Sequence, residues 1–221
     1  MKRLRSVFLC ALLTFCGAAQ AGGGSLVQIV VDGTNYGVDV QPINDKAGTF
    51  IGSLTGADYL VTLTGAYNFD PYISWNFSAT NTAAHQVTFG FDFLGLTLAD
   101  GPYDLLTNSL SATLNDDPYG AESMIALVED AVLNGNIYSN GPWNMNGSQS
   151  FAHIMQWPVT ALPGGTFGMS LRFTLGEEGD SAIASGRVEL ANAQVPEPTT
   201  LALFGLGLAG LGAMRRRKLA A

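Results

Sequence analysis

The sequence predicts an all-β protein, an antiparallel β-sandwich of the jelly-roll or immunoglobulin-like type. Two observations carry this prediction: short stretches in which apolar and polar residues alternate, and turn-forming clusters that separate these stretches. Alternation with a period of two indicates a strand with one buried and one exposed face, which antiparallel sheets accept. Many short strands with regular turns between them are typical of sandwiches and barrels.

The predicted strands follow this alternation along the chain. Residues 67–77 alternate with one exception, and we expect one or two strands interrupted near Pro71, because proline cannot donate to a strand ladder. The other alternating segments are 27–31, 61–64, 87–93, 110–114, 169–175 and 188–190. Clusters of turn-forming residues predict turns at 32–35, 99–102, 115–118, 162–165 and 176–180.

One stretch is compatible with two structures. One interpretation of this run is an apolar helical stripe formed by Met124, Leu127, Val128 and Ala131, yet the same run also suits a buried strand. The next segment contains Asn134-Gly135, which is a two-residue turn signal for a β-hairpin. We therefore expect a strand here, followed by a hairpin.

The N-terminus has the features of a secretory signal peptide. Lys2, Arg3 and Arg5 precede an apolar run at 7–15, and Ala19-Gln20-Ala21 follows before Gly22. A basic start, a short apolar core and an A-x-A site predict cleavage by signal peptidase near Ala21. The chain is then expected to divide into a signal peptide (1–21), an exported β-sandwich domain (22–194) and a C-terminal segment (195–221).

The exported part is strongly acidic and free of cysteine. Cys10 and Cys16, the two cysteines of the chain, lie in the predicted signal peptide, so disulfides and thiolate chemistry are excluded from the rest. Residues 22–198 hold three positive and eighteen negative side chains, a net charge of −15 against −8 for the whole chain. Such a surface repels nucleic acid and anionic lipid headgroups. We expect neither as a partner.

The sequence offers little for catalysis. Its two histidines, His85 and His153, are expected in surface or structural positions, and no nucleophile-elbow, zinc-protease or phosphate-binding motif occurs. The adjacent carboxylates at 116–117 and 177–178 would point to opposite faces of a strand and so form no glycosidase pair. We therefore expect no enzyme activity, and a polysaccharide hydrolase is the enzymatic alternative.

One acidic turn is a candidate cation site. Asp116, Asp117 and Glu122 concentrate the oxygen ligands that calcium prefers. Their spacing does not match an EF-hand, and a solvated acidic turn is the alternative. Apart from calcium at this turn, we expect no cofactor.

Aromatic residues in loops point to carbohydrate binding as an alternative function. Trp143 falls in the polar, turn-rich segment 140–147, and Tyr72 also has polar neighbours. A flat ring on a loop can stack against a sugar while neighbouring amides and carboxylates form hydrogen bonds. The other interpretation is that Trp143 folds back to cap the sandwich, because large aromatic side chains are usually mostly buried.

The C-terminal segment contains three elements in order. Val195-Pro196-Glu197-Pro198 is followed by an apolar run at 199–214 and then by Arg215-Arg216-Arg217-Lys218. The two prolines favour an extended backbone around Glu197. From Leu201 to Met214 the run has 14 residues, which is short against the ~20 needed to cross a bilayer core. We expect one short hydrophobic helix, transient anchoring in the inner membrane, and a cytoplasmic basic end.

This order of elements resembles the PEP-CTERM sorting signal of Gram-negative bacteria. The resemblance covers Val195 to Lys218, and segments 70–75 and 179–186 look like parts of the exported domains of such proteins. It implies export, recognition by an exosortase, which is a membrane-embedded processing enzyme, and association with exopolysaccharide and biofilm matrix. The implied protein is a non-enzymatic cell-surface or extracellular protein with an inner-membrane precursor.

Overall fold

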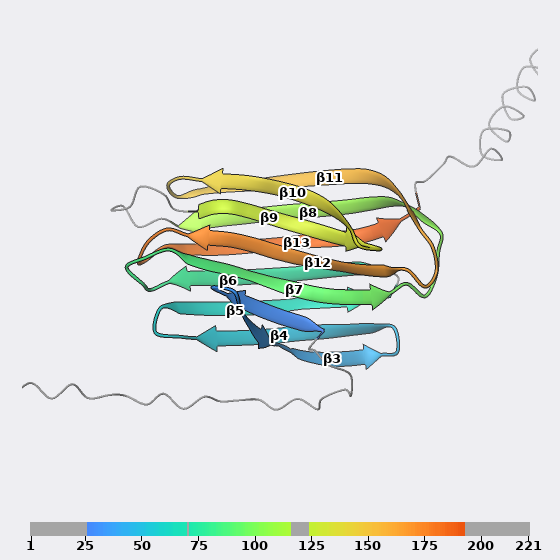
Figure 1. Ribbon diagram of the computed structural model, residues 1–221, viewed down its shortest axis with the longest axis horizontal. Helices are drawn as coiled ribbons and strands as arrows, with labels where there is room; N and C mark the ends of the chain where they lie inside the picture. The colour runs from blue at the N-terminus through green and yellow to red at the C-terminus, as the bar shows by residue number, and fades with distance from the viewer. Residues whose placement is uncertain (1–25, 70, 116–123, 193–221) are drawn as a thin grey trace, which may run out of the picture. The chain divides into compact units, whose positions relative to one another are not determined.

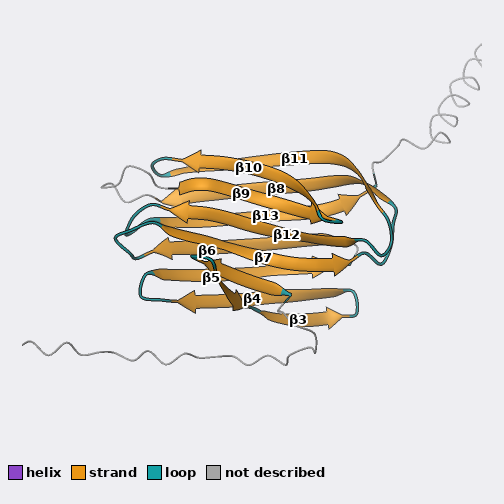
Figure 2. Ribbon diagram, in the orientation of Figure 1, coloured by secondary structure: helices purple, strands orange, loops and turns teal. Residues whose placement is uncertain are grey.

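Residues 26–69, 71–115 and 124–192 are described by the structure, which is a computed structural model. Every regular element in these residues is a β-strand (Figure 2). The predicted all-β class is therefore confirmed. The strands are β1 (Val27–Val31), β2 (Thr34–Gly37), β3 (Asp39–Asn44), β4 (Ala47–Thr55), β5 (Tyr59–Asn68), β6 (Tyr72–Asn81), β7 (Val87–Thr97), β8 (Tyr103–Asn115), β9 (Met124–Leu133), β10 (Asn136–Met145), β11 (Gln149–Ala161), β12 (Thr166–Leu175) and β13 (Ser181–Ala191).

The strands form two antiparallel sheets that lie face to face (Figure 1). Sheet A has the strand order β10-β9-β12-β7-β1-β2, and sheet B has the order β11-β8-β13-β6-β5-β4-β3. Their inner faces meet in one aromatic core, in which the Phe91 ring lies 5.2 Å from Trp75 and 5.9 Å from Phe77. Burial of so many large apolar side chains is the main term that stabilises a domain without disulfides.

Strand pairing selects the jelly roll from the two predicted types. From β6 to β13 the chain behaves as one long hairpin folded over both sheets. Strand β6 pairs with β13, β7 with β12, β8 with β11, and β9 with β10. This nested pairing of eight strands across two sheets is the jelly-roll arrangement. Strands β1 and β2 extend sheet A, and β5, β4 and β3 extend sheet B.

The ambiguous stretch after residue 123 is a strand, as expected. In β9 a positive φ of 52° at Ala126 coincides with irregular pairing to both neighbouring strands. This irregularity puts Met124 and Leu127 on the same buried face although they are three residues apart. A bulge of this kind imitates helical spacing in the sequence. The predicted hairpin at Asn134-Gly135 is also confirmed, because β9 pairs with β10 across it.

Two predictions about the elements need correction. The segment 140–147 was expected to be a loop, but residues up to Met145 belong to β10, whose pairing with β9 is irregular between Asn140 and Trp143. The glycine and proline at 141 and 142 mark that irregularity and not a turn. Strands β3, β4 and β11 were not predicted, because their alternation is mixed with Gly, Pro and Ala.

Several predictions fall outside the described residues. They concern the signal peptide, the turn with Asp116, Asp117 and Glu122, and the apolar run near the C-terminus. The chain divides into two compact units between Ala191 and Asn192, and all thirteen strands belong to the first unit. Within the described residues, no helix has the length and apolar character needed to cross a membrane.

Candidate functional site

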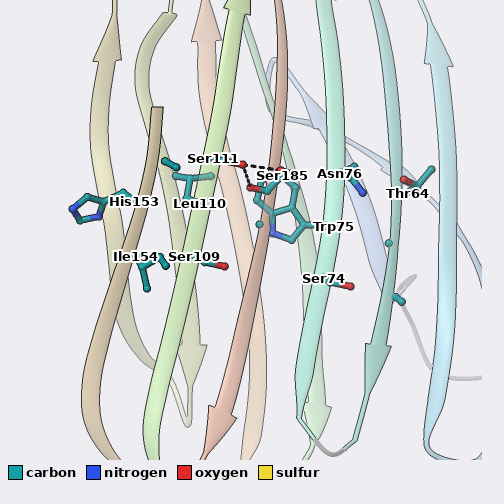
Figure 3. Close-up of a pocket in the computed structure, with 14 residues that line it drawn as sticks. Thr64, Ser74, Trp75, Asn76, Ser109, Leu110, Ser111, His153, Ile154 and Ser185 are labelled. Carbon is teal, nitrogen blue, oxygen red and sulfur yellow. Dashed lines mark hydrogen bonds between the residues drawn. The ribbon is translucent and has the colours of Figure 1, made fainter. Parts of the chain in front are cut away.

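The outer face of sheet B contains a shallow trough that runs across the strands. It crosses β5, β6, β13, β8 and β11 and has a volume of about 680 Å³. Because neighbouring strands lie about 4.8 Å apart, five strands give it a length of about 19 Å. Its polar lining is mostly serine, threonine and asparagine, as Figure 3 shows.

Strand register assembles the trough from two rows of side chains. Along the first row, paired residues on successive strands are Thr64, Asn76, Ser185, Ser111 and Ala152. Along the second row they are Ala66, Ser74, Arg187, Ser109 and Ile154. Apart from Arg187 and Ile154, the side chains in these rows are short and leave the sheet surface open, and large residues between them, such as Trp75 and Leu110, point into the core.

The polar side chains of the trough differ in whether they have hydrogen-bond partners in the protein. On the central strands, the Ser111 and Ser185 hydroxyls lie 2.8 Å apart, and Ser109 Oγ donates to the Arg187 carbonyl at 3.2 Å. Within the described residues, the side chains of Thr64, Ser74 and Asn76 have no hydrogen-bond partner. Asn76 and Thr64 are exposed. These groups on β5 and β6 are available to a ligand.

This face is nearly free of charge. The five strands contain three charged residues, Asp104, Arg187 and Glu189. Arg187 Nε donates to Glu189 Oε2 at 2.6 Å, so their charges are paired. The Arg187 guanidinium also lies 4.4 Å from the centre of the Tyr72 ring. Tyr72, a predicted ligand-binding residue, therefore sits on the trough face, one row beyond the trough itself.

Trp143, the other predicted ligand-binding residue, lies elsewhere. It is half-buried on β10 in sheet A, where its ring is 4.6 Å from His153 and 5.8 Å from Phe151. Its Nε1 donates to Asn140 Oδ1 at 3.2 Å. The structure therefore places Trp143 and Tyr72 at separate positions, and a ligand-binding role for either stays a prediction.

A buried polar cluster behind the trough was missed by sequence reasoning. Trp75 Nε1 donates to Glu129 Oε1 at 2.8 Å, and Asn108 Nδ2 donates to the Glu129 carbonyl at 3.2 Å. Glu129 is fully buried, and among the described atoms its Oε2 has no hydrogen-bond partner. Burial raises the pKa of Glu129 to about 8, against the smaller opposing effect of the Trp75 hydrogen bond. The bulge at Ala126 sets which β9 residues face inward, and alternation alone does not show it.

The histidines have structural or surface surroundings in keeping with the sequence. His85 is exposed just before β7, and His153 Nδ1 lies 3.2 Å from Asn140 Oδ1. In the described part of the chain, no three acidic, histidine or cysteine side chains gather closely enough to hold a metal. The candidate calcium ligands Asp116, Asp117 and Glu122 lie outside that part.

Comparison with known proteins adds the decisive observation for the tail. The PEP-CTERM protein-sorting motif matches residues 194–218. The chain carries a PEP-CTERM sorting signal. This confirms the resemblance seen in the Pro-Glu-Pro triplet, the apolar run and the basic end. A PEP-CTERM signal marks an exported protein that is anchored through its C-terminal tail before an exosortase processes it.

No curated protein sequence matches this PEP-CTERM chain. Among solved structures, similarity is found to the CBM22-1 and GH10 modules of a Clostridium thermocellum xylanase complexed with xylohexaose, at 11% identity and a TM-score of 0.29. That match covers 58% of this chain and 27% of the other, so the chain spans about a quarter of that structure. A CBM22-1 xylan-binding domain from Paenibacillus barcinonensis matches at 12% identity, with 79% and 99% covered and a TM-score of 0.26. The jelly-roll assignment rests on the strand order and not on these scores.

Proposed function

We propose that this PEP-CTERM protein is an exported, non-catalytic protein of the cell surface or extracellular matrix, and that it binds a neutral exopolysaccharide along the trough of sheet B. The observation that carries the proposal is an uncharged, hydroxyl-lined trough on a domain that is otherwise strongly acidic.

Charge favours a neutral ligand. The acidic residues of the domain repel a polyanion from any direction of approach, and the paired Arg187 offers little to offset this repulsion. A neutral sugar chain is not repelled. Its hydroxyl groups can donate to and accept from the side chains of Ser74, Asn76 and Thr64.

Shape favours an extended chain. The trough is shallow and runs across five strands without a closed end wall, so a polymer can enter and leave at either end. Its lining combines short polar side chains with apolar groups that include Trp75 and Ile154, and Tyr72 provides one aromatic side chain next to it. Binding then depends on several modest hydrogen bonds, each of about 1 kcal/mol. Trp143 acts indirectly, by packing against His153, whose backbone lines the trough.

Processing at both ends belongs to the same proposal. Signal peptidase removes 1–21, the segment 195–221 holds the precursor in the inner membrane, and an exosortase releases the domain to the surface or the matrix. The biofilm matrix of a Gram-negative bacterium is the setting in which a non-catalytic protein binds exopolysaccharide.

The test is a binding measurement on the exported chain with two neutral glycans, xylan and mixed-linked β-glucan, and with a polyuronate. We expect binding to a neutral glycan and none to the polyuronate. Ser74→Ala combined with Asn76→Ala removes two contacts of about 1 kcal/mol each, so affinity should fall about tenfold or more. Ser139→Ala, exposed on β10 in sheet A, is the matched control. Equal affinity of the double variant and the control would contradict the proposal.

A further inference from the structure

One edge of sheet B is a long strand with nothing paired to its outer side. Strand β11 has 13 residues and pairs with β8 along most of its length. No described strand lies on its other side, as its end position in sheet B shows (Figure 1). In such a strand every second backbone N–H and C=O group points away from the sheet.

The other three edge strands carry features that prevent pairing. Strand β2 has four residues. Strand β3 contains Asp39 and Pro42, and β10 contains Pro142 at the point where its pairing is irregular. Short length, charge, proline and irregular register are the usual protections of a sheet edge. Three of the four described sheet edges are therefore protected against pairing with another strand.

Strand β11 lacks these protections over most of its length. Its sequence contains no Asp, Glu, Lys or Arg, and its one proline, Pro158, stands near the end. This leaves nine residues, from Gln149 to Trp157, without proline and without charge. They include Phe151, Ile154 and Trp157, which favour strand structure. Ile154 is 66% exposed on the trough face.

Charge limits where two copies of this chain can meet. Two copies of a domain this acidic repel each other through most of their surfaces. The β11 edge is a place where they can meet without bringing charges together. A strand that pairs antiparallel with its own copy also satisfies the symmetry of a two-fold dimer, in which both copies use the same surface.

We propose that a second copy of this chain pairs with β11 through its own β11, so that two copies of sheet B form one continuous sheet. Pairing between edge strands uses main-chain hydrogen bonds for affinity. A register centred on His153 puts Ile154 of each copy opposite Ala152 of the other, a large side chain against a small one. On the inner side, Asn140 Nδ2 approaches the His153 carbonyl at 3.5 Å, a long contact that pairing can replace.

Dimerisation has a consequence for the trough. In each copy the trough ends at Ala152 and Ile154 on β11. Joining the two β11 strands brings these ends together, so ten strands span one trough of about 43 Å. The dimer itself follows from the edge strand and does not depend on what the trough binds.

The first test is the molar mass of the exported chain in solution, measured by light scattering during size exclusion. We expect a dimer. Ile154→Lys puts a charge on the exposed edge, and its mass should fall to that of a monomer. Ile183→Lys is the matched control, because Ile183 is 54% exposed on the same sheet face but lies on the central strand β13. A monomeric native chain, or equal masses for the two variants, would overturn the inference.

The second test fixes the register. The exported domain has no cysteine, so His153→Cys introduces one thiol at the proposed axis. Residues directly opposite in an antiparallel pair lie within the reach of a disulfide. Mild oxidation should therefore give a covalent dimer for His153→Cys and not for Ile183→Cys. Equal cross-linking of both variants would contradict β11 pairing, whereas a dimer that binds no glycan would contradict only the proposed function.

Discussion

Glu129 is a fully buried carboxylic acid, so its surroundings differ strongly from water. Its carboxyl group is enclosed between the sheets, close to Trp75 and Asn108, and its pKa is raised from 4.5 to about 8 mainly by burial. Asp130, next to it in the chain, adds to the increase. His153 is connected to this group through Asn140, whose Oδ1 lies 3.2 Å from His153 Nδ1 and whose Nδ2 donates to Asn108 Oδ1 at 3.2 Å. The carboxyl is therefore protonated in the folded protein at neutral pH.

This protonation links stability to pH. Between pH 4.5 and about 8 the unfolded chain has lost the Glu129 proton while the folded chain keeps it. The folded state then binds more protons, so the free energy of unfolding falls as pH rises, by about 1.4 kcal/mol per pH unit. Below this range both states are protonated, and the contribution of Glu129 is constant.

Glu129→Gln tests this link at one residue. Glutamine keeps an oxygen that accepts from Trp75 Nε1 but has no proton to lose. The free energy of unfolding of the variant, measured by urea titration, should lack the decline that the native chain shows between about pH 5 and pH 7.5. Comparing the two chains cancels every pH dependence that they share. Parallel curves would contradict a buried, protonated Glu129.

The residue scale also shows where sequence reasoning stops. His85 and His153 were correctly expected to be surface or structural residues. Glu129 could not be recognised, because the bulge at Ala126 changes which side of β9 faces the core. Trp143 was assigned to a loop because glycine and proline precede it, although edge strands tolerate both.

At the scale of elements, the hairpin between β9 and β10 lies at the tip of the folded-over chain. Asn134 and Gly135 have φ values of 50° and 79°, both in the left-handed region. Asn134 Oδ1 also accepts from the Thr166 backbone N–H at 2.8 Å, which fixes the hairpin against the start of β12. The Asn-Gly signal was readable in the sequence because few residue pairs accept this backbone.

Substitution at Gly135 measures how much this turn contributes. Gly135→Ala should lower the free energy of unfolding by about 1 kcal/mol, because a Cβ atom disfavours the left-handed backbone. Gly135→Asn is the control, since asparagine tolerates that conformation and should lower stability less. Urea unfolding of both variants gives the comparison, and an equal loss would argue against strain at this φ.

The strands that were easiest to predict are those with one apolar face and one polar face. Strand β1 was predicted with its observed bounds, and β7 and β12 were found because phenylalanine and leucine alternate with polar residues. Strand β11 was missed, since its inward positions include a histidine and its outward positions include alanine, isoleucine and proline. Its inward side chains are only half-buried, as suits an edge strand.

At the scale of the molecule, the trough exists because the register of strand pairing brings its residues side by side. Its two rows combine residues from β5, β6, β8, β11 and β13, and the most distant of them in the first row, Thr64 and Ser185, are about 120 positions apart in the chain. No local pattern in the sequence places Asn76 beside Ser185, because long-range pairing decides it. The sorting signal is the opposite case: its elements are contiguous, and it was recognisable without any structure.

The tail prediction concerns the whole precursor. Replacing Pro196, Glu197 and Pro198 with alanine should block processing, because the triplet belongs to the matched sorting motif and its two prolines favour the extended backbone that we expect a processing enzyme to recognise. Cells producing this variant should accumulate a larger, membrane-bound form on immunoblots of separated fractions. Leu219→Ala, just beyond the matched residues 194–218, is the control and should be processed normally. Release of mature-sized protein by the triple variant would contradict the prediction.

The position of β13 sets the order in which the domain can be completed. It is the last strand of the described residues, yet it lies in the middle of sheet B and is the one described link between β8 and β6. Until residues 181–191 have been made and delivered across the membrane, β11-β8 and β6-β5-β4-β3 remain two separate fragments with open edges. Contacts between such distant segments form slowly. A chain truncated just before β13 should therefore be an aggregation-prone and protease-sensitive product, so completion of the fold is linked to delivery of the segment just before the sorting signal.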